Sequence, residues 1–309
     1  MTDLKLFRLD DEGRDVEMRG STAPLERDLQ RRIEAGMEAM LGIRFLASEY
    51  PTGPWHRGRV DSLGLDENGT PVVIEYKKAS HAGVVSQAVS YLSWLKSARH
   101  EFHALVKERL GDDAAESIDW RTPRVVCIAS DFYQHDRIAV RELGKRIDLV
   151  RYRLFDGGLL SLLLVESVSG SAEPVSEPSL PDRGVLPSAG GGGRTVLATL
   201  YGAPSSLRAL YDELHEVLTA SGEVEVEAKL HYIAYRRMVN VACVQFRPAQ
   251  SAIVVYLKLD PDSIDLEDGF TRDMRGVGHH GTGDLQVRIT SAAALEKATP
   301  LIQRAFEAA

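Results

Sequence analysis

Three charged side chains, Asp61, Glu75 and Lys77, stand in two apolar, strand-like runs of this 309-residue chain. The two runs are residues 58–66 and 71–77. The residues that join them, 67–70, have Asn-Gly at their centre, which predicts a β-hairpin. Because strand side chains alternate, Glu75 and Lys77 share one face, which Asp61 can reach from the partner strand. Two carboxylates beside one amine predict a site for a hard divalent cation next to a positive charge.

The same three residues have an ordinary structural interpretation. A Glu-x-Lys pair is common on the solvated face of a surface strand, and short motifs match by chance. The strand that ends in Glu75 and Lys77 is otherwise apolar, however, and charges in a buried strand need partners or a metal ion. The apolar context therefore favours a site over a solvated face.

Two helices are predicted beside these strands. Apolar residues recur at helical spacing from 25 to 41 and again from 84 to 95. Glu26 lies in the first turn of the first helix, where a carboxylate either faces the site or complements the helix dipole. Gln87 and Tyr91 are one turn apart on the second helix and so address one surface. There Gln87 either orients a substrate or a water, or binds backbone.

Basic residues gather in the sequence around the same strands, with Arg59 and Lys78 next to the three charged residues. We expect Arg59, Lys78 and Tyr91 to contact the substrate, with phosphate as the group that the cations bind. The net charge of the chain is −8, which speaks against a surface coated for indiscriminate DNA binding. Any phosphate-binding face must therefore be local.

The segment 24–97 resembles the PD-(D/E)XK nuclease superfamily, and within it the NucS-like branch. The resemblance is carried by Gly-Arg-Val-Asp, which ends at Asp61, and by Val-Ile-Glu-Tyr-Lys, which ends at Lys77. Glu26 and Gln87 reinforce it. It implies an α/β fold with a restriction-endonuclease-like core, in which helices flank a mixed sheet. The predicted order of helix, three strands, helix and strand agrees with that core.

The resemblance also implies an activity, the metal-dependent hydrolysis of phosphodiester bonds by a DNA endonuclease. Asp61, Glu75 and the carbonyl oxygen of Tyr76 would hold Mg²⁺ or Mn²⁺. Lys77 would position the attacking water and stabilise the anionic transition state. The expected catalytic residues are Asp61, Glu75, Lys77, Glu26 and Gln87. The alternative is a catalytically weak or silent protein that binds nucleic acid, or another partner, on a nuclease core.

Composition divides the chain into two domains. Residues 168–194 are rich in Ser, Pro and Gly, which is typical of a flexible linker. We expect a nuclease-like domain over 1–167 and a small α+β domain of unknown role over 195–309. In the second domain the pattern predicts helices over 200–218 and 291–308, with strands between them. The predicted strands are 223–226, 231–236, 239–246 and 252–259.

The second domain resembles an uncharacterised domain found at the ends of several bacterial proteins. The resemblance rests on the motif Lys-Leu-His-Tyr-Ile-Ala-Tyr at 229–235 and on Gly-His-His-Gly-Thr-Gly-Asp at 278–284. His279, His280 and Asp284 lack the usual spacing of metal ligands, so the motif favours a structural turn, or a loop whose backbone approaches an anion or a partner. A second candidate surface, for stacking and phosphate contacts, comprises Tyr232, Tyr235, Arg236 and Arg237.

No apolar run approaches the roughly 20 residues that a membrane span needs, and the charged N-terminus is unlike a signal peptide. The two cysteines stand in apolar runs, as buried reduced thiols do. These features favour a cytoplasmic protein that binds no membrane, and the resemblance to the nucleases implies that it binds DNA. A homodimer and a protein partner for the C-terminal domain are further expectations.

Overall fold

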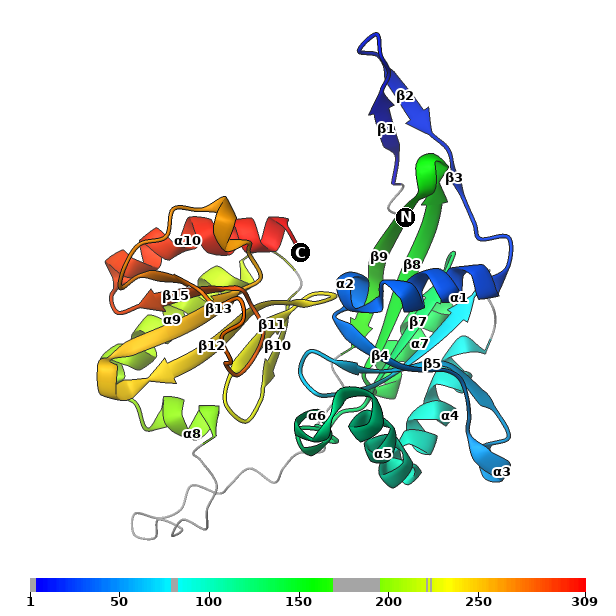
Figure 1. The fold of residues 1–309 in the computed structure, drawn as a ribbon, viewed down its shortest axis with the longest axis horizontal. Coiled ribbons are helices and arrows are strands. Elements are labelled where there is room, and N and C mark those ends of the chain that lie inside the picture. The colour runs from blue at the N-terminus through cyan, green and yellow to red at the C-terminus, as the bar shows by residue number, and fades with distance from the viewer. Residues whose placement is uncertain (1–3, 79–82, 169–194, 221, 223) are drawn as a thin grey trace. The chain divides into compact units, whose positions relative to one another are not determined.

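The computed structural model describes residues 4–78, 83–168, 195–220, 222 and 224–309 (Figure 1). Its internal contacts divide the chain into two compact units, Met1–Glu177 and Pro178–Ala309. Of the predicted linker, residues 169–194 lie outside the described residues. Val168 is the last residue of strand β9 (Leu159–Val168), so the ordered strand reaches one residue further than the predicted first domain.

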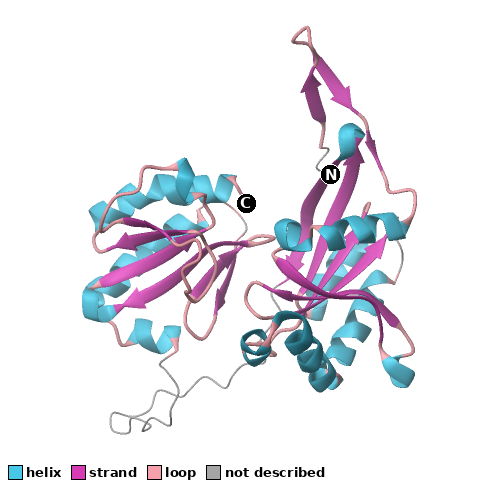
Figure 2. Ribbon diagram, in the orientation of Figure 1, coloured by secondary structure: helices cyan, strands magenta, loops and turns pink. Residues whose placement is uncertain are grey.

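The first unit is built on a seven-stranded mixed sheet in the order β3-β8-β7-β6-β5-β4, with β9 paired to β8 (Figure 2). The β6–β7 and β7–β8 pairs are parallel, and the other pairs are antiparallel. A separate hairpin of β1 and β2 precedes the sheet. The remaining strands are β1 Leu6–Leu9, β2 Asp15–Met18, β3 Gly20–Ser21, β4 Ile43–Pro51, β5 Arg59–Asp66, β6 Pro71–Lys77, β7 Arg124–Ala129 and β8 Ile147–Phe155.

Helices flank this sheet on both faces, as the sequence predicts for an α/β protein. On one face α1 lies across β5 and β6, and on the other α4 packs against β6 and β7 (Figure 1). Alternation along β5 separates the two layers, because Ser62 bonds to Glu34 of α1 while Leu63 joins the core with α4. The helices of this unit are α1 Glu26–Ala35, α2 Met37–Leu41, α3 Gly53–His56, α4 Val84–Ser97, α5 Arg99–Leu110, α6 Asp112–Glu116, α7 Gln134–Leu143 and the 3₁₀ turn η1 Asp156–Gly158.

The predicted hairpin forms, and its turn explains its register. One carboxylate oxygen of Asp66 accepts the backbone N–H groups of Asn68 (2.9 Å) and Thr70 (2.8 Å). Gly69 has φ of 74°, a conformation that glycine adopts without steric cost. A side chain there would also meet the carbonyl oxygen of Ser117 at 2.7 Å. The turn thereby fixes which residues of β5 and β6 lie opposite each other.

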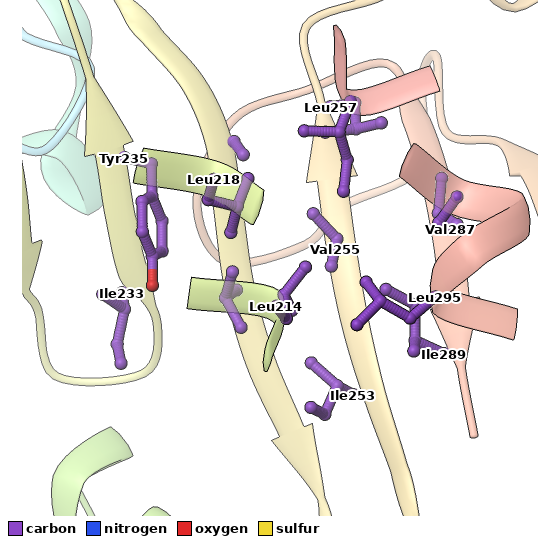
Figure 3. Close-up of a cluster of buried hydrophobic side chains, with 14 of the residues drawn as sticks. Leu214, Leu218, Ile233, Tyr235, Ile253, Val255, Leu257, Val287, Ile289 and Leu295 are labelled. Carbon is purple, nitrogen blue, oxygen red and sulfur yellow. The ribbon is translucent and has the colours of Figure 1, made fainter. Parts of the chain in front are cut away.

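The second unit is a six-stranded antiparallel sheet in the order β10-β11-β12-β13-β15-β14. Residues from α8, α9 and α10 pack on one face of it, where Leu214, Leu218 and Leu295 meet Val255 and Val287 (Figure 3). The elements are α8 Val196–Tyr201, α9 Ser205–Thr219, β10 Glu225–Ala228, β11 Ile233–Arg236, β12 Asn240–Arg247, η2 Pro248–Gln250, β13 Ala252–Leu257, η3 Pro261–Ser263, β14 Thr271–Asp273, β15 Leu285–Ile289 and α10 Ala292–Glu307.

In the described part of the chain, none of the helices has the length and apolarity required to cross a membrane. Both cysteines, Cys127 and Cys243, are buried free thiols, as the sequence predicts.

Candidate functional site

The candidate site forms where the β5–β6 ladder ends. The paired residues run from Leu65 and Pro71 to Ser62 and Ile74, and the next position brings Asp61 opposite Glu75. From this position on, side-chain carboxylates accept the hydrogen bonds of the backbone N–H groups. One oxygen of Asp61 accepts the Tyr76 N–H at 3.0 Å, and one oxygen of Glu75 accepts the Asp61 N–H at 3.3 Å. Each carboxylate therefore satisfies the backbone of the opposite strand and is held in place by it.

The two carboxylates lie in an environment that disfavours their charges. Glu75 is fully buried, and its Oε2 has no hydrogen-bond partner among the described residues. Burial and the nearby charge of Asp61 raise the pKa of Glu75 to about 8. Burial also raises the pKa of Asp61, against the opposing effects of the Tyr76 N–H and of Lys77. A cation at this position would relieve that cost, because two carboxylates in contact cannot both ionise cheaply.

Lys77 supplies one positive charge at the site. Its Nζ lies 3.6 Å from Oε2 of Glu75 and 3.6 Å from Oε1 of Glu26. Burial lowers the pKa of Lys77, but Glu75, Asp61 and Glu26 outweigh it and raise that pKa above its usual range. The ammonium group is therefore charged at neutral pH. It is too far from Glu75 for a hydrogen bond, so it can turn towards another anion.

Glu26 reaches the site from the first turn of α1, the position that the sequence leaves open between a site role and a dipole role. Besides its ion pair with Lys77, its Oε2 accepts the backbone N–H of Lys78 at 3.0 Å. Glu26 therefore joins α1 to the end of β6. The side chain of Lys78 itself is exposed.

Gln87, Tyr91 and Arg59 form a chain of contacts at one side of the site. The amide of Gln87 donates to the Tyr91 hydroxyl at 3.0 Å, and that hydroxyl donates to the Arg59 carbonyl at 2.8 Å. Tyr91 is only 5% exposed, so its ring anchors β5 to α4 and offers little surface to a substrate. The exposed side chain of Arg59 pairs with Glu49 at 3.0 Å. Of the three residues expected to contact substrate, Arg59 and Lys78 are thus exposed and Tyr91 is buried.

Sequence reasoning missed a polar row on α1 that supports the site. Gln30 is buried and donates to the Asp61 carbonyl (2.9 Å) and to the Ser48 hydroxyl (3.1 Å). One turn further on, Glu34 accepts the Ser62 hydroxyl at 2.6 Å. Glu26, Gln30 and Glu34 follow one another at four-residue intervals, which places them on one side of the helix. This four-residue spacing was the signal in the sequence from which the row could have been predicted.

The donor set fits a divalent cation that keeps part of its water shell. No group of three or more His, Cys, Asp or Glu side chains suited to a metal ion occurs within the described residues. Asp61 and Glu75 therefore offer two carboxylates and not a closed cage. Mg²⁺ is usually bound in this way, through one or two carboxylates with water and phosphate oxygens as further ligands. The unpartnered Oε2 of Glu75 is a buried oxygen that a cation would satisfy.

Comparison with known proteins gives matches for both parts of the chain. Residues 197–309 match the family model of a domain of unknown function, DUF5655. An uncharacterised protein of Haemophilus influenzae is 23% identical over 290 residues, which cover 92% of this chain and 93% of the relative.

Two solved structures are similar over 42% of this chain, each at 20% identity. They are an EndoMS–dsDNA2 complex, with 46% of that chain covered and a TM-score of 0.26, and a repair endonuclease from Pyrococcus abyssi, with 49% covered and a TM-score of 0.28. This chain thus spans about half the length of each. At such TM-scores the likeness is too slight to assign an activity, so the function has to be inferred from the site.

Proposed function

We propose that the first unit is a metal-dependent DNA endonuclease that hydrolyses phosphodiester bonds. The observation that supports this most directly is the pair of carboxylates, half-buried Asp61 and fully buried Glu75, that face each other beside the ammonium group of Lys77. A purely structural role would not need two adjacent acids whose pKa values burial raises, one of which also raises the pKa of the other. The same group is well suited to phosphate chemistry, where a metal ion and a lysine share the negative charge.

Asp61, Glu75 and the carbonyl oxygen of Tyr76 would hold Mg²⁺ or Mn²⁺. When bound, such an ion lowers the pKa of a coordinated water and neutralises charge on the phosphate. The backbone N–H groups of Asp61 and Tyr76 already fix one oxygen of each carboxylate, so the ligands are oriented before the ion arrives.

Lys77 is the group that we expect to stabilise the transition state. Its charge persists at neutral pH because three carboxylates surround it, and it makes no short hydrogen bond that it would have to break. An ammonium group placed in this way stabilises the negative charge that develops on the phosphate. Glu26 holds Lys77 from the other side. Arg59 and Lys78, both exposed, would bind the flanking phosphates of the DNA.

The test is cleavage of single-stranded, branched and mismatched DNA with Mg²⁺ or Mn²⁺. We expect Asp61→Asn to abolish cleavage and Lys77→Ala to slow it by about 100-fold or more. The matched control is Lys107→Ala, which removes an exposed lysine from α5. The native tryptophan fluorescence of each variant checks that the fold is retained.

Two outcomes would contradict the proposal. If Asp61→Asn or Lys77→Ala cleaves as fast as the parent, the site is wrongly assigned. If the parent shifts DNA in a gel with Ca²⁺ but cleaves none of the substrates with Mg²⁺ or Mn²⁺, the alternative is correct. The protein then binds nucleic acid on a nuclease core without cutting it.

A further inference from the structure

The sheet of the second unit has a polar, cationic face opposite its helices. Register places Tyr256 of β13, Gln286 of β15 and Arg272 of β14 side by side across three strands. Gln245 and Arg247 point to the same face from β12, because they alternate with Phe246, which is buried under the helices. This face differs from the predicted phosphate surface. There Tyr235 is fully buried, and Arg236 is 3% exposed and paired with Glu225.

The loop that carries the Gly-His-His-Gly-Thr-Gly-Asp motif lies directly on this face. Gly281 has φ of 87°, and a Cβ there would lie 2.7 Å from Cβ of Cys243. Gly283 has φ of 131°, and a Cβ there would lie 2.8 Å from the backbone carbonyl carbon of Tyr256. Only glycine combines these conformations with such close approach. The two glycines thus press the loop against β12 and β13, which is the structural turn expected from the motif.

The two histidines of the loop are held apart, which argues against a shared metal ion. The ring of His279 stacks on Tyr256 at 4.2 Å, whereas that of His280 lies against His231 at 4.2 Å. The His280 carbonyl accepts the amide of Gln245 at 2.8 Å, and Gln245 in turn accepts Arg247 at 2.9 Å. Gln245 is 2% exposed. One buried amide therefore positions both the loop backbone and an arginine.

His279 has an unused polar atom. Its Nδ1 lies 3.0 Å from the Val277 carbonyl. A carbonyl oxygen can only accept, so Nδ1 carries the hydrogen. The other ring nitrogen, Nε2, is buried and has no hydrogen-bond partner among the described residues. Stacking on Tyr256 fixes the direction of the ring.

A cavity of about 450 Å³ lies between the loop and the sheet face. It is lined by Gln245, Arg247, Tyr256, Arg272, Met274, Val277, Gly278, His279, His280 and Gln286. No carboxylate is among these lining residues, and neither Arg247 nor Arg272 forms an ion pair within the described chain. Burial lowers the pKa of His280, and the neighbouring His231 and Arg247 lower it further. We propose that this cavity binds a phosphate-bearing anion through Arg247 and Arg272.

The chemistry of the lining favours phosphate. Arginine donates two hydrogen bonds in one plane, a geometry that matches two oxygens of a phosphate. The stacked rings of Tyr256 and His279 form an aromatic side of the cavity. A volume near 450 Å³ is in the range of small-ligand pockets and suits a group of about nucleotide size. The site is separate from Asp61 and Glu75 and does not depend on the proposed nuclease activity.

The test is isothermal titration of the full chain in EDTA with three probes: inorganic phosphate, a purine nucleoside 5′-monophosphate and a short oligodeoxynucleotide. The first two probe a free phosphate ligand and the third a nucleic-acid backbone. We expect saturable binding of at least one probe. Arg247→Gln and Arg272→Gln should each weaken it about tenfold, the loss of one charge-assisted contact. Arg288→Gln is the matched control, since Arg288 lies on the same sheet face but donates to Gln250 and does not line the cavity.

Binding that is lost in Arg247→Gln and Arg272→Gln, but kept in Arg288→Gln and in Asp61→Asn, supports the proposal and separates this site from the first unit. The probe that binds most tightly identifies the source of the phosphate. The proposal is overturned if no probe binds saturably, or if both cavity variants bind as tightly as the parent. An equal loss of binding in Arg288→Gln would also overturn the proposal, because the anion would then be attracted by the overall positive charge of the face and not by the cavity.

Discussion

Glu75→Gln isolates the energetic cost of the second carboxylate at the site. Glutamine keeps the size of the side chain and the oxygen that accepts the Asp61 N–H, but it carries no charge. Burial and Asp61 raise the pKa of Glu75 from 4.5 to about 8. The folded protein therefore holds a proton there that the unfolded chain releases above about pH 4.5. For this group, the free energy of unfolding must fall as pH rises from about 4.5 to about 8.

The size of the effect follows from the two pKa values of Glu75, 4.5 and about 8. Each pKa unit corresponds to about 1.4 kcal/mol. At pH 7 the carboxyl is mostly protonated in the folded state and ionised in the unfolded state, so Glu75 lowers the free energy of unfolding by about 3 kcal/mol. Glutamine has no proton to take up. We expect Glu75→Gln to be more stable than the parent by about this amount at pH 7, and by almost nothing near pH 4.

Urea unfolding in EDTA, followed by tryptophan fluorescence, measures this difference. All three tryptophans of the chain lie in the first unit, so the signal reports that unit alone. Glu108→Gln, on the exposed side of α5, is the control and should change stability by less than about 0.5 kcal/mol. A gain that is absent at pH 7, or equally large at pH 4 and pH 7, would refute the inference that Glu75 is buried next to a second charge.

Two more substitutions test the first unit, one at the buried ion pair that joins Arg124 of β7 to Asp148 of β8 and one at the support of the site. Asp148→Asn leaves the buried guanidinium of Arg124 facing a neutral amide. We expect the free energy of unfolding to fall by about 3–5 kcal/mol in the same assay, because a buried charge that loses its counter-ion is strongly destabilising. Gln30→Leu removes the amide that holds the Asp61 carbonyl, and we expect cleavage or Mn²⁺ affinity to fall about 10–100-fold. The control is Gln134→Leu, at the start of α7, which should leave both unchanged. Unchanged Mn²⁺ binding and cleavage in Gln30→Leu would show that α1 does not position the site.

Strand alternation was enough to bring together the acids of the site. It placed Glu75 and Lys77 on one face, and the Asn-Gly turn fixed the strand that carries Asp61. The four-residue row on α1 was equally visible in the sequence. It escaped notice because Gln30 works through a backbone carbonyl, and nothing in a residue type says which backbone atom it will meet.

Helix boundaries were the least predictable part of the fold. The helix predicted from 25 to 41 is interrupted at Gly36, a weak helix former, and continues as α2. The helix predicted over 200–218 is two helices, because Pro204 has no N–H to donate and begins α9 instead of continuing α8. Strands β14 and β15 were not predicted, since they are only three and five residues long.

The cationic face of the second unit shows where sequence reasoning is weakest. Tyr232, Tyr235, Arg236 and Arg237 were expected to form a phosphate surface because aromatic and basic residues adjoin in the sequence. The first three are buried, and Arg237 donates to the Phe306 carbonyl. The residues that do line the cavity are dispersed over β12, β13, β14, β15 and the glycine-rich loop. Only the pairing of non-adjacent strands, with β13 next to β15, brings them together.

The position of the proposed nuclease site at the end of a ladder has a physical reason. Where β5 and β6 stop pairing, the N–H groups of Asp61 and Tyr76 would otherwise have no acceptor, and the side chains of Glu75 and Asp61 supply one. The same two hydrogen bonds orient the carboxylates, so ordering them adds little to the cost of folding. What they cannot remove is the repulsion between buried Glu75 and half-buried Asp61 when both are charged, which persists until a cation or a proton enters. The strand end therefore stores, as lost stability, part of the free energy with which a metal ion would bind.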